Sequence, residues 1–418
     1  MFPVYFGRCY MQTATKKQKK KKQWVLRRHQ AVRDLLYWPL YIYVTLRYRI
    51  RIQKLPKDTP QCVVLTNHQT AFDQFFVSIS FPQHIYYVSS EDLFSKGWIS
   101  RLITWLVAPI PFRKSTSDLN GVKNCLRIVR EGGSIGMAPE GNRTYSGTTE
   151  YMKPSVANLM RATGLPLMLY RIEGGYGAHP RWSDTVRRGK MRSYVARIIQ
   201  PEEYRGMTNE ALFEIIKKEL YVDERLDKTC FYGKKNAEYL DRVMYVCPYC
   251  GLSELHSRKD MISCCKCGMQ VRYLPDKRLE GVGFDFPYPY VKEWYDAQSD
   301  YIRNLDLESY GDDFIYRDTV RYSENIYCKH KVMKDEASVL TVFKDRFEVK
   351  TKDGLDVYPF EKVYSATVLG RNKLNLYVGN QIFQFSGSKH FNPVKYLNLY
   401  FHAAGKEKGN DCDEFLGL

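Results

Sequence analysis

The sequence predicts an α/β layer fold, followed by a small cysteine-rich ribbon and a C-terminal antiparallel β-barrel-like domain with a terminal helix. Three observations support this prediction. Up to residue 232, short apolar runs alternate with segments of helical spacing, a pattern typical of α/β proteins. Two Cys-x2-Cys pairs follow, and beyond residue 331 short alternating runs are separated by turn pairs. With 418 residues, 44% of them hydrophobic and 14% aromatic, the chain can bury a large core and is not of the disordered class.

The N-terminal segment, residues 1–58, is strongly basic. Residues 1–60 hold 15 Lys and Arg residues but only 2 acidic ones, so they carry +13 of the net charge of +18. No apolar run directly follows the basic stretch 16–22, so we expect no secretory signal here. The apolar stretch 35–46 contains Pro39 and is far shorter than the roughly 20 residues of a transmembrane helix. Because aromatic and basic residues interleave, we expect an interfacial helix or hairpin on an anionic membrane; a nucleic-acid-binding or merely solvated tail is the alternative.

The α/β domain is expected to span residues 59–232. Apolar, β-branched runs predict strands at residues 62–66, 86–88, 110–113, 134–138, 165–172 and 191–199. Apolar residues at helical spacing predict helices at residues 72–81, 98–107, 121–131 and 156–163. Since strands and helices alternate, the helices are expected to cover the faces of one sheet.

Four cysteines share a spacing that is typical of metal sites: Cys247, Cys250, Cys264 and Cys267. Each Cys-x2-Cys pair forms a tight turn whose two thiolates grip one tetrahedral ion, and a Gly relieves the turn after each pair. The sequence therefore predicts a zinc ribbon at residues 243–275, with Cys265 outside the ligand set. Four thiolates leave no open position on the ion, so we expect a structural Zn²⁺ rather than a catalytic one. The remaining cysteines are scattered without pattern, as in proteins of a reducing compartment.

Beyond the ribbon, residues 276–330 are expected to form a linker rich in Pro and aromatic residues, with a helix at residues 291–305. Residues 331–418 hold about six short alternating runs and an amphipathic segment at residues 393–404. This pattern predicts a β module with a terminal helix, which resembles a pleckstrin-homology-type domain.

A His five residues before an Asp can form a pair in which the carboxylate orients the imidazole as a general base. The spacing alone is not specific, because four of the eight histidines have it: His29, His68, His179 and His330. Only His68, paired with Asp73, ends a predicted buried strand and leads into a helix. This position would place its imidazole at the carboxyl edge of the sheet. We expect the other three to be solvated or capping histidines.

A second candidate block, residues 139–144 (PEGNRT), follows the predicted strand at residues 134–138. Gly141 lets the backbone approach a ligand, and Arg143 offers a planar fork for a phosphate. Asn142 and Thr144 can donate further hydrogen bonds. Arg113 ends another extended segment, residues 110–114 (IPFRK), and adds a cation.

Taken in order, four blocks resemble those of the glycerolipid (1-acylglycerol-3-phosphate) O-acyltransferase family. NHQTAFD is similar to the family's N-H-x4-D block, and PEGNRT to its E-G-T-R-S block. IPFRK resembles its phosphate-binding Arg block, and LPL its closing V-P-I block, so the resemblance covers roughly residues 60–200. It implies an acyltransferase-type sheet, His68 as general base and Asp73 as its partner. It further implies that Arg143, Glu140 and Gly141 hold the acceptor phosphate, with help from Arg113.

The resemblance implies an enzyme of phospholipid biosynthesis. Acyl-CoA or acyl-carrier protein would donate a fatty acyl chain to a lysophospholipid, giving phosphatidate from 1-acylglycerol-3-phosphate, with no catalytic cofactor. We expect a cytoplasmic protein, peripheral on the inner face of an anionic membrane, with no nucleic-acid partner. The chain departs from the family's pattern at Ala138, Asn142 and Thr144. These departures bear more on the identity of the acceptor than on the acyl-transfer chemistry that the resemblance implies.

Three alternatives remain open at this point. The acceptor is a different lipid or a polyol; or the protein is a nucleic-acid-binding zinc-ribbon protein, as the Lys tract would allow; or the acyltransferase fold is an inactive scaffold. The second leaves the blocks around His68 and Glu140 unexplained, and the intact His68/Asp73 pair argues against the third.

Overall fold

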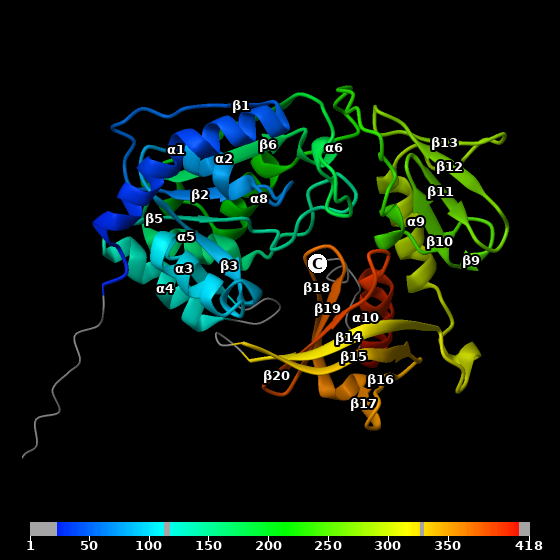
Figure 1. Cartoon of the computed structure of the whole chain (residues 1–418). Coiled ribbons are helices and arrows are strands. Elements are labelled where there is room, and N and C mark those ends of the chain that lie inside the picture. Colours follow the sequence, from blue (N-terminus) through cyan, green and yellow to red (C-terminus); the bar gives the residue numbers. More distant parts are fainter. Residues whose placement is uncertain (1–22, 113–117, 327–329, 409–418) are drawn as a thin grey trace, which may run out of the picture.

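The computed structural model describes residues 23–112, 118–326 and 330–408, which form an α/β domain, a cysteine-rich region and a C-terminal β module (Figure 1). The basic stretch 16–22 and Arg113 lie outside the described residues. The short 3-10 helices of the described part are Glu91–Phe94, Leu240–Arg242, Glu308–Tyr310 and Phe360–Lys362.

The α/β domain is built on one seven-stranded sheet with the order β1-β7-β6-β2-β5-β3-β4. Neighbouring strands are parallel except for β6 and β7, which are antiparallel. The strands are β1 (Ile50–Ile52), β2 (Val63–Thr66), β3 (Ile85–Ser90), β4 (Ile110–Phe112), β5 (Ser134–Met137), β6 (Leu167–Glu173) and β7 (Met191–Ile199). The six predicted strands are all present, and β1 is an addition of three residues.

Helices cover both faces of this sheet because side chains alternate along its strands. Val63 and Leu65 of β2 pack with α4 (Leu119–Arg130), α5 (Ser155–Thr163) and α8 (Asn209–Leu220). Val64, between them, packs with α1 (Arg27–Tyr48) and α2 (Asp73–Ser80) on the other face. The remaining helices of the domain are α3 (Trp98–Val107), α6 (Gly175–Ala178) and α7 (Pro201–Arg205). These layers confirm the predicted α/β class.

Helix α1 decides between the two shapes expected for the apolar stretch 35–46. The stretch lies within a single helix of 22 residues that continues through Pro39, so it is not a hairpin. None of the helices in the described ranges combines the length and apolar character that a membrane-spanning segment requires.

The cysteine-rich region consists of a two-stranded hairpin and a four-stranded antiparallel sheet. The hairpin pairs β8 (Val246–Cys247) with β9 (Gly251–Leu252). The sheet has the order β10-β11-β12-β13, with β10 (Leu255–Arg258), β11 (Met261–Cys264), β12 (Gln270–Tyr273) and β13 (Leu279–Gly281). Helix α9 (Val291–Arg303) follows within the predicted range.

The C-terminal module is a seven-stranded antiparallel sheet with the order β17-β16-β15-β14-β20-β19-β18. It contains β14 (Tyr316–Asn325), β15 (Lys331–Val342), β16 (Arg346–Lys350), β17 (Leu355–Pro359), β18 (Val363–Leu369), β19 (Lys373–Val378), β20 (Gln381–Ser386) and the terminal helix α10 (Pro393–Lys408). The antiparallel module with a terminal helix is thereby confirmed.

One boundary needs correction. Strand β14 belongs to the segment 276–330 that was expected to be a linker, yet it lies between β15 and β20 in the middle of the strand order. Its first four residues alternate half-buried and exposed side chains, and only Val320 and Tyr322 are deeply buried apolar residues, so its hydrophobic signal is weak.

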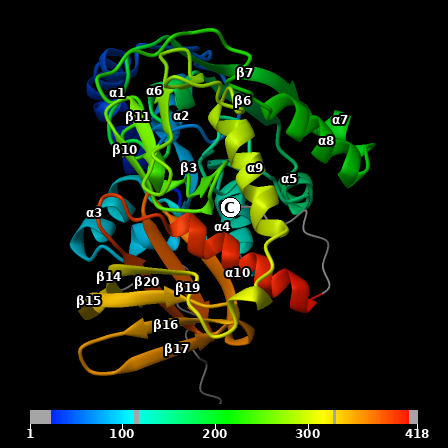
Figure 2. The ribbon, with the colours of Figure 1, turned by 90° about the vertical axis from the view of Figure 1, so that its right-hand side faces the viewer.

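The cysteine-rich region and the C-terminal module share one buried apolar cluster, to which Tyr145 and Trp182 of the α/β domain also contribute. Helices α9 and α10 contact each other in this cluster and lie side by side in Figure 2. The appended parts are therefore packed firmly against the α/β domain rather than tethered to it.

Candidate active site

The imidazole of His68 and the carboxylate of Asp73 form the centre of the candidate site. His68 lies just beyond the end of β2, and Asp73 is the first residue of α2. The two atoms His68 Nδ1 and Asp73 Oδ2 are 2.8 Å apart. The His68 side chain is 26% exposed, whereas that of Asp73 is 3% exposed. The structure thus joins the pair that the spacing suggested, with the imidazole toward solvent and the carboxylate inside.

The turn between them folds around the carboxylate. Asp73 also accepts hydrogen bonds from the backbone N–H groups of Gln69 and Thr70 and from the Thr70 hydroxyl. A carboxylate at a helix N-terminus satisfies N–H groups that have no helical partner and interacts favourably with the helix dipole. Since the Asp73 carboxylate can only accept, His68 Nδ1 carries the proton and Nε2 is the basic nitrogen.

Asn67 fixes the strand end that carries this turn. Its side-chain amide donates to the Ile172 carbonyl at 2.8 Å and accepts from the Ile172 N–H at 2.7 Å. Ile172 belongs to β6, the neighbour of β2, so the amide continues the sheet pairing beyond the last residue of β2.

Glu140 connects the second predicted block to the first. Its carboxylate accepts from the His68 N–H at 2.7 Å and from the Glu150 N–H at 2.8 Å, and the residue is buried. Burial raises the pKa of Glu140 well above its usual value, and the nearby carboxylates of Glu150 and Asp73 add to this, while the two N–H donors oppose it. These contacts differ from the expected ones. Both oxygens of the Glu140 carboxyl group accept hydrogen bonds from backbone N–H groups, so the group holds the loop rather than a substrate phosphate.

The loop after Glu140 uses its other polar groups internally as well. The fully buried Thr144 hydroxyl donates to the Glu150 carboxylate and accepts from the N–H groups of Ser146 and Gly147. Thr144 was expected to donate to substrate, but these bonds commit it to the loop. Gly141 is exposed and has a φ of 69°, a left-handed conformation that suits glycine at this turn. The buried Asn142 accepts a hydrogen bond from Arg181 through its Oδ1.

Arg143 presents a cation to the same region. Its Nη1 atom is buried and has no hydrogen-bond partner in the part of the chain that the structure describes. Burial, followed by the charges of Arg181 and Arg371, lowers the pKa of Arg143 to about 10, with Asp73 acting in the opposite direction. A buried guanidinium N–H without a partner is suited to bind an anion. Arg113, the other predicted phosphate ligand, lies outside the described residues.

Two histidines expected to be solvated are buried instead. The imidazole of His29 bonds to the Tyr86 hydroxyl at 3.0 Å. His179 bonds to the Tyr48 hydroxyl through Nδ1 at 2.9 Å and to Arg371 through Nε2 at 3.1 Å. Burial, with Arg371 and Arg143, lowers the pKa of His179 to about 3, so it is neutral. His330 is exposed, in agreement with the expectation.

Sequence reasoning treated His179 only as a solvated or capping histidine, and it missed three further residues of this region, Tyr48, Arg181 and Arg371. No local pattern marks them, because Tyr48 and Arg371 are 131 and 192 residues away from the His179 that they contact.

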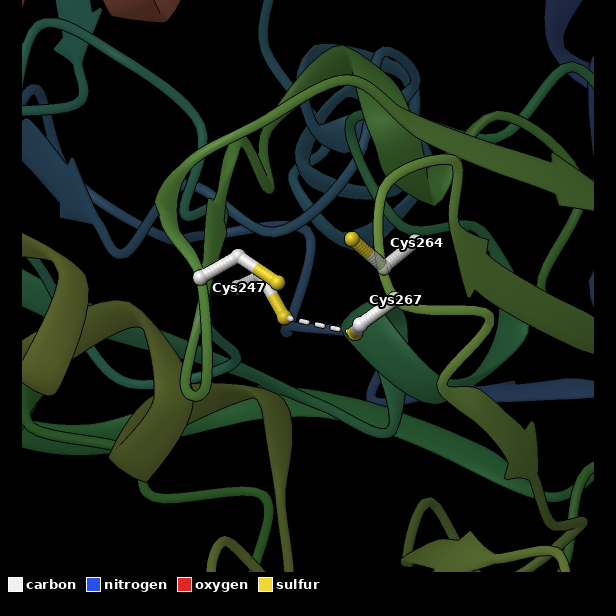
Figure 3. Close-up of side chains that lie close together, drawn as sticks. Cys247, Cys264 and Cys267 are labelled. Carbon is white, nitrogen blue, oxygen red and sulfur yellow. Dashed lines mark hydrogen bonds between the residues drawn. The ribbon is translucent and has the colours of Figure 1, made fainter.

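The four predicted cysteine ligands also come together. The Sγ atoms of Cys247, Cys250, Cys264 and Cys267 all lie within 4.8 Å of one another. Figure 3 shows Cys247 facing Cys264 and Cys267 from a separate loop. The Cys247 and Cys267 sulfur atoms are 3.7 Å apart, close to the edge of about 3.8 Å in a tetrahedron with Zn–S bonds of about 2.3 Å. The donor set therefore fits a zinc ion, and Cys265 is not part of the cluster.

Comparison with known proteins bears on the α/β domain. Residues 47–171 match the family model described as Acyltransferase. The 1-acyl-sn-glycerol-3-phosphate acyltransferase BAT2, chloroplastic, of Brassica napus is 25% identical over 138 residues, which are 32% of this chain and 39% of the plant protein. The 1-acyl-sn-glycerol-3-phosphate acyltransferase of Bacillus subtilis (strain 168) is 22% identical over 202 residues, 45% of this chain and 96% of the bacterial protein. The crystal structure of the 1-acyl-sn-glycerophosphate (LPA) acyltransferase PlsC from Thermotoga maritima is 18% identical, with a TM-score of 0.38, and the match covers 46% of this chain and 80% of that one.

The fold and the site define an α/β protein with a His–Asp pair at the carboxyl end of a parallel strand and an arginine after the neighbouring strand β5. Residues 47–171 match the Acyltransferase family model, in agreement with the resemblance of the four sequence blocks. The chain spans less than half the length of the Brassica napus relative and of a second plant relative, the 1-acyl-sn-glycerol-3-phosphate acyltransferase LPAT1, chloroplastic, of Arabidopsis thaliana. The cysteine-rich region and the C-terminal module lie outside the residues matched by the family model.

Proposed function

We propose that this protein is an O-acyltransferase that moves a fatty acyl chain from acyl-CoA or acyl-carrier protein to the free hydroxyl of a lysophospholipid. The acceptor we favour is 1-acylglycerol-3-phosphate, which gives phosphatidate. The observation that carries the proposal is the 2.8 Å pair of His68 and Asp73 within an acyltransferase-family domain. Curated relatives that match part of this chain are named 1-acyl-sn-glycerol-3-phosphate acyltransferases.

The geometry supports a direct transfer. Asp73 holds the proton on His68 Nδ1, so Nε2 takes the proton of the acceptor hydroxyl as its oxygen attacks the thioester carbonyl. The tetrahedral intermediate then expels the donor thiolate, which receives the proton from Nε2. One ester bond forms, one thioester bond breaks and a free thiol is released. The buried Asp73 carboxylate stabilises the imidazolium that exists between the two proton transfers.

Arg143 supplies the charge for the acceptor headgroup. Its Nη1 is buried and has no hydrogen-bond partner among the described residues. A phosphate oxygen would give this donor an acceptor through a charge-assisted hydrogen bond. Glu140 and Thr144 instead hold the loop that carries it. A neutral lipid or a polyol is the other acceptor class, and it would leave this cation unused.

An exposed apolar surface on α1 and α3 supports attachment to a membrane. Trp38 of α1 and Trp98 and Trp105 of α3 are 61%, 70% and 53% exposed. Arg28 of α1 joins the two helices, since it stacks on the Trp105 ring and donates to the Trp105 carbonyl. Aromatic and basic side chains together suit the headgroup layer of an anionic membrane.

We propose peripheral binding at the inner, cytoplasmic face, where anionic lipids attract the basic N-terminal segment. At its other end, α1 reaches the candidate site through the bond from Tyr48 to His179. The catalytic pair would thus lie near the surface that holds the lipid substrate.

The cysteine cluster is proposed to hold a structural zinc ion, because four thiolates would close its coordination sphere. The transfer reaction written above needs no catalytic cofactor. A nucleic-acid partner is not part of the proposal, because it would leave the His68 and Arg143 arrangement without a use.

The experiment that tests this function supplies purified protein with labelled acyl-CoA and a panel of acceptors. We expect transfer to lysophosphatidate, with phosphatidate as the product identified by mass, and slower transfer to lysophosphatidylcholine, monoacylglycerol and glycerol. If an acceptor without a phosphomonoester were acylated faster, 1-acylglycerol-3-phosphate would not be the acceptor, and the faster substrate would take its place. Failure to acylate any of them, in the presence of anionic vesicles, would contradict the function.

A further inference from the structure

The turn between β18 and β19 of the C-terminal module reaches the arginine loop of the candidate site. The contact runs through Arg181, which is buried in the α/β domain. Its guanidinium donates to the carbonyls of Val368 and Gly370, at 2.9 and 3.0 Å, at the end of β18 and in the turn. The same guanidinium donates to the Arg143 carbonyl at 3.1 Å and to the Asn142 side chain at 3.3 Å. One side chain thus ties the turn to the loop that carries Arg143.

Arg371 lies in this turn and extends back into the α/β domain. Its Nη2 donates to His179 Nε2 at 3.1 Å, and its Nη1 donates to Asp184 Oδ1 at 3.0 Å. Because a guanidinium only donates, the His179 Nε2 must accept, and the proton on Nδ1 points to the Tyr48 hydroxyl. The position of the Arg371 side chain is therefore fixed from two sides.

Two guanidinium groups of this cluster are incompletely satisfied. Arg371 Nε, like Arg143 Nη1, is buried and without a hydrogen-bond partner among the residues that the structure describes. Buried donors of this kind are rare because they have lost water without gaining a protein acceptor. The charge of Arg371 also disfavours the charged form of Arg143, so the two cations are close enough to interact. Two interacting cations that each keep an open donor are suited to bind an anion.

Within the described part of the chain, two nearby acidic residues, Asp184 and Asp73, are already engaged elsewhere. Asp184 already accepts from Arg242 through both of its oxygens, at 2.7 and 3.2 Å, in addition to Arg371. Asp73 is held by His68 and by the turn that precedes α2. The open donors on Arg143 and Arg371 are therefore left for a ligand.

On the basis of the proposed function, we propose that the β18–β19 turn completes the acceptor site. Arg371 is a second guanidinium ligand for the phosphomonoester of the acceptor beside Arg143, and Arg181 is a positioning residue that holds the turn in place. A dianionic phosphate satisfies both cations, whereas a neutral headgroup satisfies neither. The C-terminal module, which lies outside the family domain at residues 47–171, then determines headgroup specificity.

The test measures acyl transfer by the full-length protein with lysophosphatidate and with monoacylglycerol, which lacks the phosphate. Arg371→Gln removes the charge and keeps a donor for Asp184, and Arg371→Lys keeps the charge without the fork. Arg346→Gln is the matched control, because Arg346 is an arginine of the same module that pairs with Asp345 and Glu348. Thermal unfolding of each variant reports whether the module remains packed.

We expect Arg371→Gln to raise the KM for lysophosphatidate by about tenfold or more, as the loss of a charge-assisted hydrogen bond predicts. The KM for acyl-CoA and the rate with monoacylglycerol should stay within about twofold, with Arg371→Lys intermediate and Arg346→Gln unchanged. An equal loss with both acceptors would show that Arg371 only holds the module and would overturn the proposal. An unchanged KM for lysophosphatidate in a folded Arg371→Gln protein would overturn it as well.

A binding measurement separates this inference from the proposed function. Titration calorimetry with glycerol 3-phosphate and with inorganic phosphate, without an acyl donor, should show weaker binding of glycerol 3-phosphate to Arg371→Gln than to the wild type. If Arg371→Gln binds glycerol 3-phosphate more weakly but the wild-type protein transfers no acyl chain, the anion site is supported and the proposed acyltransferase function is contradicted. If transfer occurs while binding of glycerol 3-phosphate does not depend on Arg371, the inference fails and the function stands. Dependence on Arg371 for inorganic phosphate alone would also overturn it, because the site would then bind the free ion and not the acceptor.

Discussion

The Glu140 carboxylate accepts a hydrogen bond of 2.7 Å from the backbone N–H of His68. This bond joins the loop after β5 to the turn after β2. The other oxygen of the Glu140 carboxylate accepts a hydrogen bond from the backbone N–H of Glu150. Because β2 and β5 are neighbouring parallel strands, their carboxyl ends meet, and Glu140 links the segments that follow them, as does the bond from the Thr144 N–H to the His68 carbonyl. The arginine loop and the His–Asp turn therefore form one rigid unit.

Replacing Glu140 by Gln tests this link. A Gln amide presents one oxygen and one NH₂ group, so one of the two backbone N–H groups would face a donor instead of an acceptor. We expect the free energy of unfolding to fall by about 1–3 kcal/mol, the cost of an unsatisfied buried donor, and kcat to fall as well. Urea denaturation and steady-state kinetics measure both. A variant as stable and as active as the wild type would show that the carboxylate does not organise the site.

Acid should destabilise the fold through two histidines whose pKa is lowered, the buried His179 and the half-buried His84. The pKa of His179 is lowered to about 3 by burial and by Arg371 and Arg143, and that of His84 to about 4, chiefly by burial. In the unfolded chain both titrate near about 6.5. As the pH falls below about 6.5 the unfolded state binds protons that the folded state refuses, so stability is lost between pH 6.5 and the folded pKa.

The contribution of His179 is measured by the pH dependence of unfolding. His179→Gln should flatten the slope of stability between pH 6 and 4 by up to about 1.4 kcal/mol per pH unit, the effect of one proton. His330→Gln replaces an exposed histidine and should leave the slope unchanged. Equal slopes for the wild type and His179→Gln would contradict a neutral, buried His179.

Zinc should be recovered with the purified protein in a ratio of one ion per chain. Because the Cys264 sulfur lies in the four-thiol cluster, Cys264→Ser should lose the metal, and both this change and chelation should lower the Tm. Cys265→Ser is the matched control, since Cys265 is adjacent in sequence but outside the cluster. Mass spectrometry measures the zinc content per chain of the wild type and of both variants. Full zinc content in Cys264→Ser would refute the ligand set.

Membrane binding should depend on the aromatic residues of α3. Trp98→Glu combined with Trp105→Glu places two charges on the exposed surface, and we expect at least a tenfold loss of binding to anionic vesicles in sedimentation. Leu355→Glu changes an exposed apolar residue of the C-terminal module and should have no such effect. Added salt should weaken the wild-type interaction because the basic residues contribute to it. Unaltered sedimentation of the double variant would exclude α3 as the contact surface.

Local patterns predicted most of the α/β domain. Strands and helices from β2 to β7 follow from apolar runs and helical spacing, and the position of His68 after a buried strand distinguished it from three other histidines. Strand β14 was missed because it has few buried apolar residues and most of its other side chains are polar or charged. The roles of Arg181 and Arg371 and the burial of His179 could not be predicted, because their contacts join residues up to 192 positions apart and depend on how the modules pack. Glu140 was assigned to substrate because a sequence motif does not show which way a carboxylate points.

The rate of acyl transfer to lysophosphatidate by His68→Ala, compared with His330→Ala, tests the central claim most directly. Both histidines precede an Asp by five residues, but only His68 contacts its Asp73 at 2.8 Å in the turn before α2. We predict that His68→Ala lowers kcat by about 10²–10⁴-fold with an unchanged Tm, and that His330→Ala keeps wild-type activity. Activity retained in a folded His68→Ala protein would contradict the account.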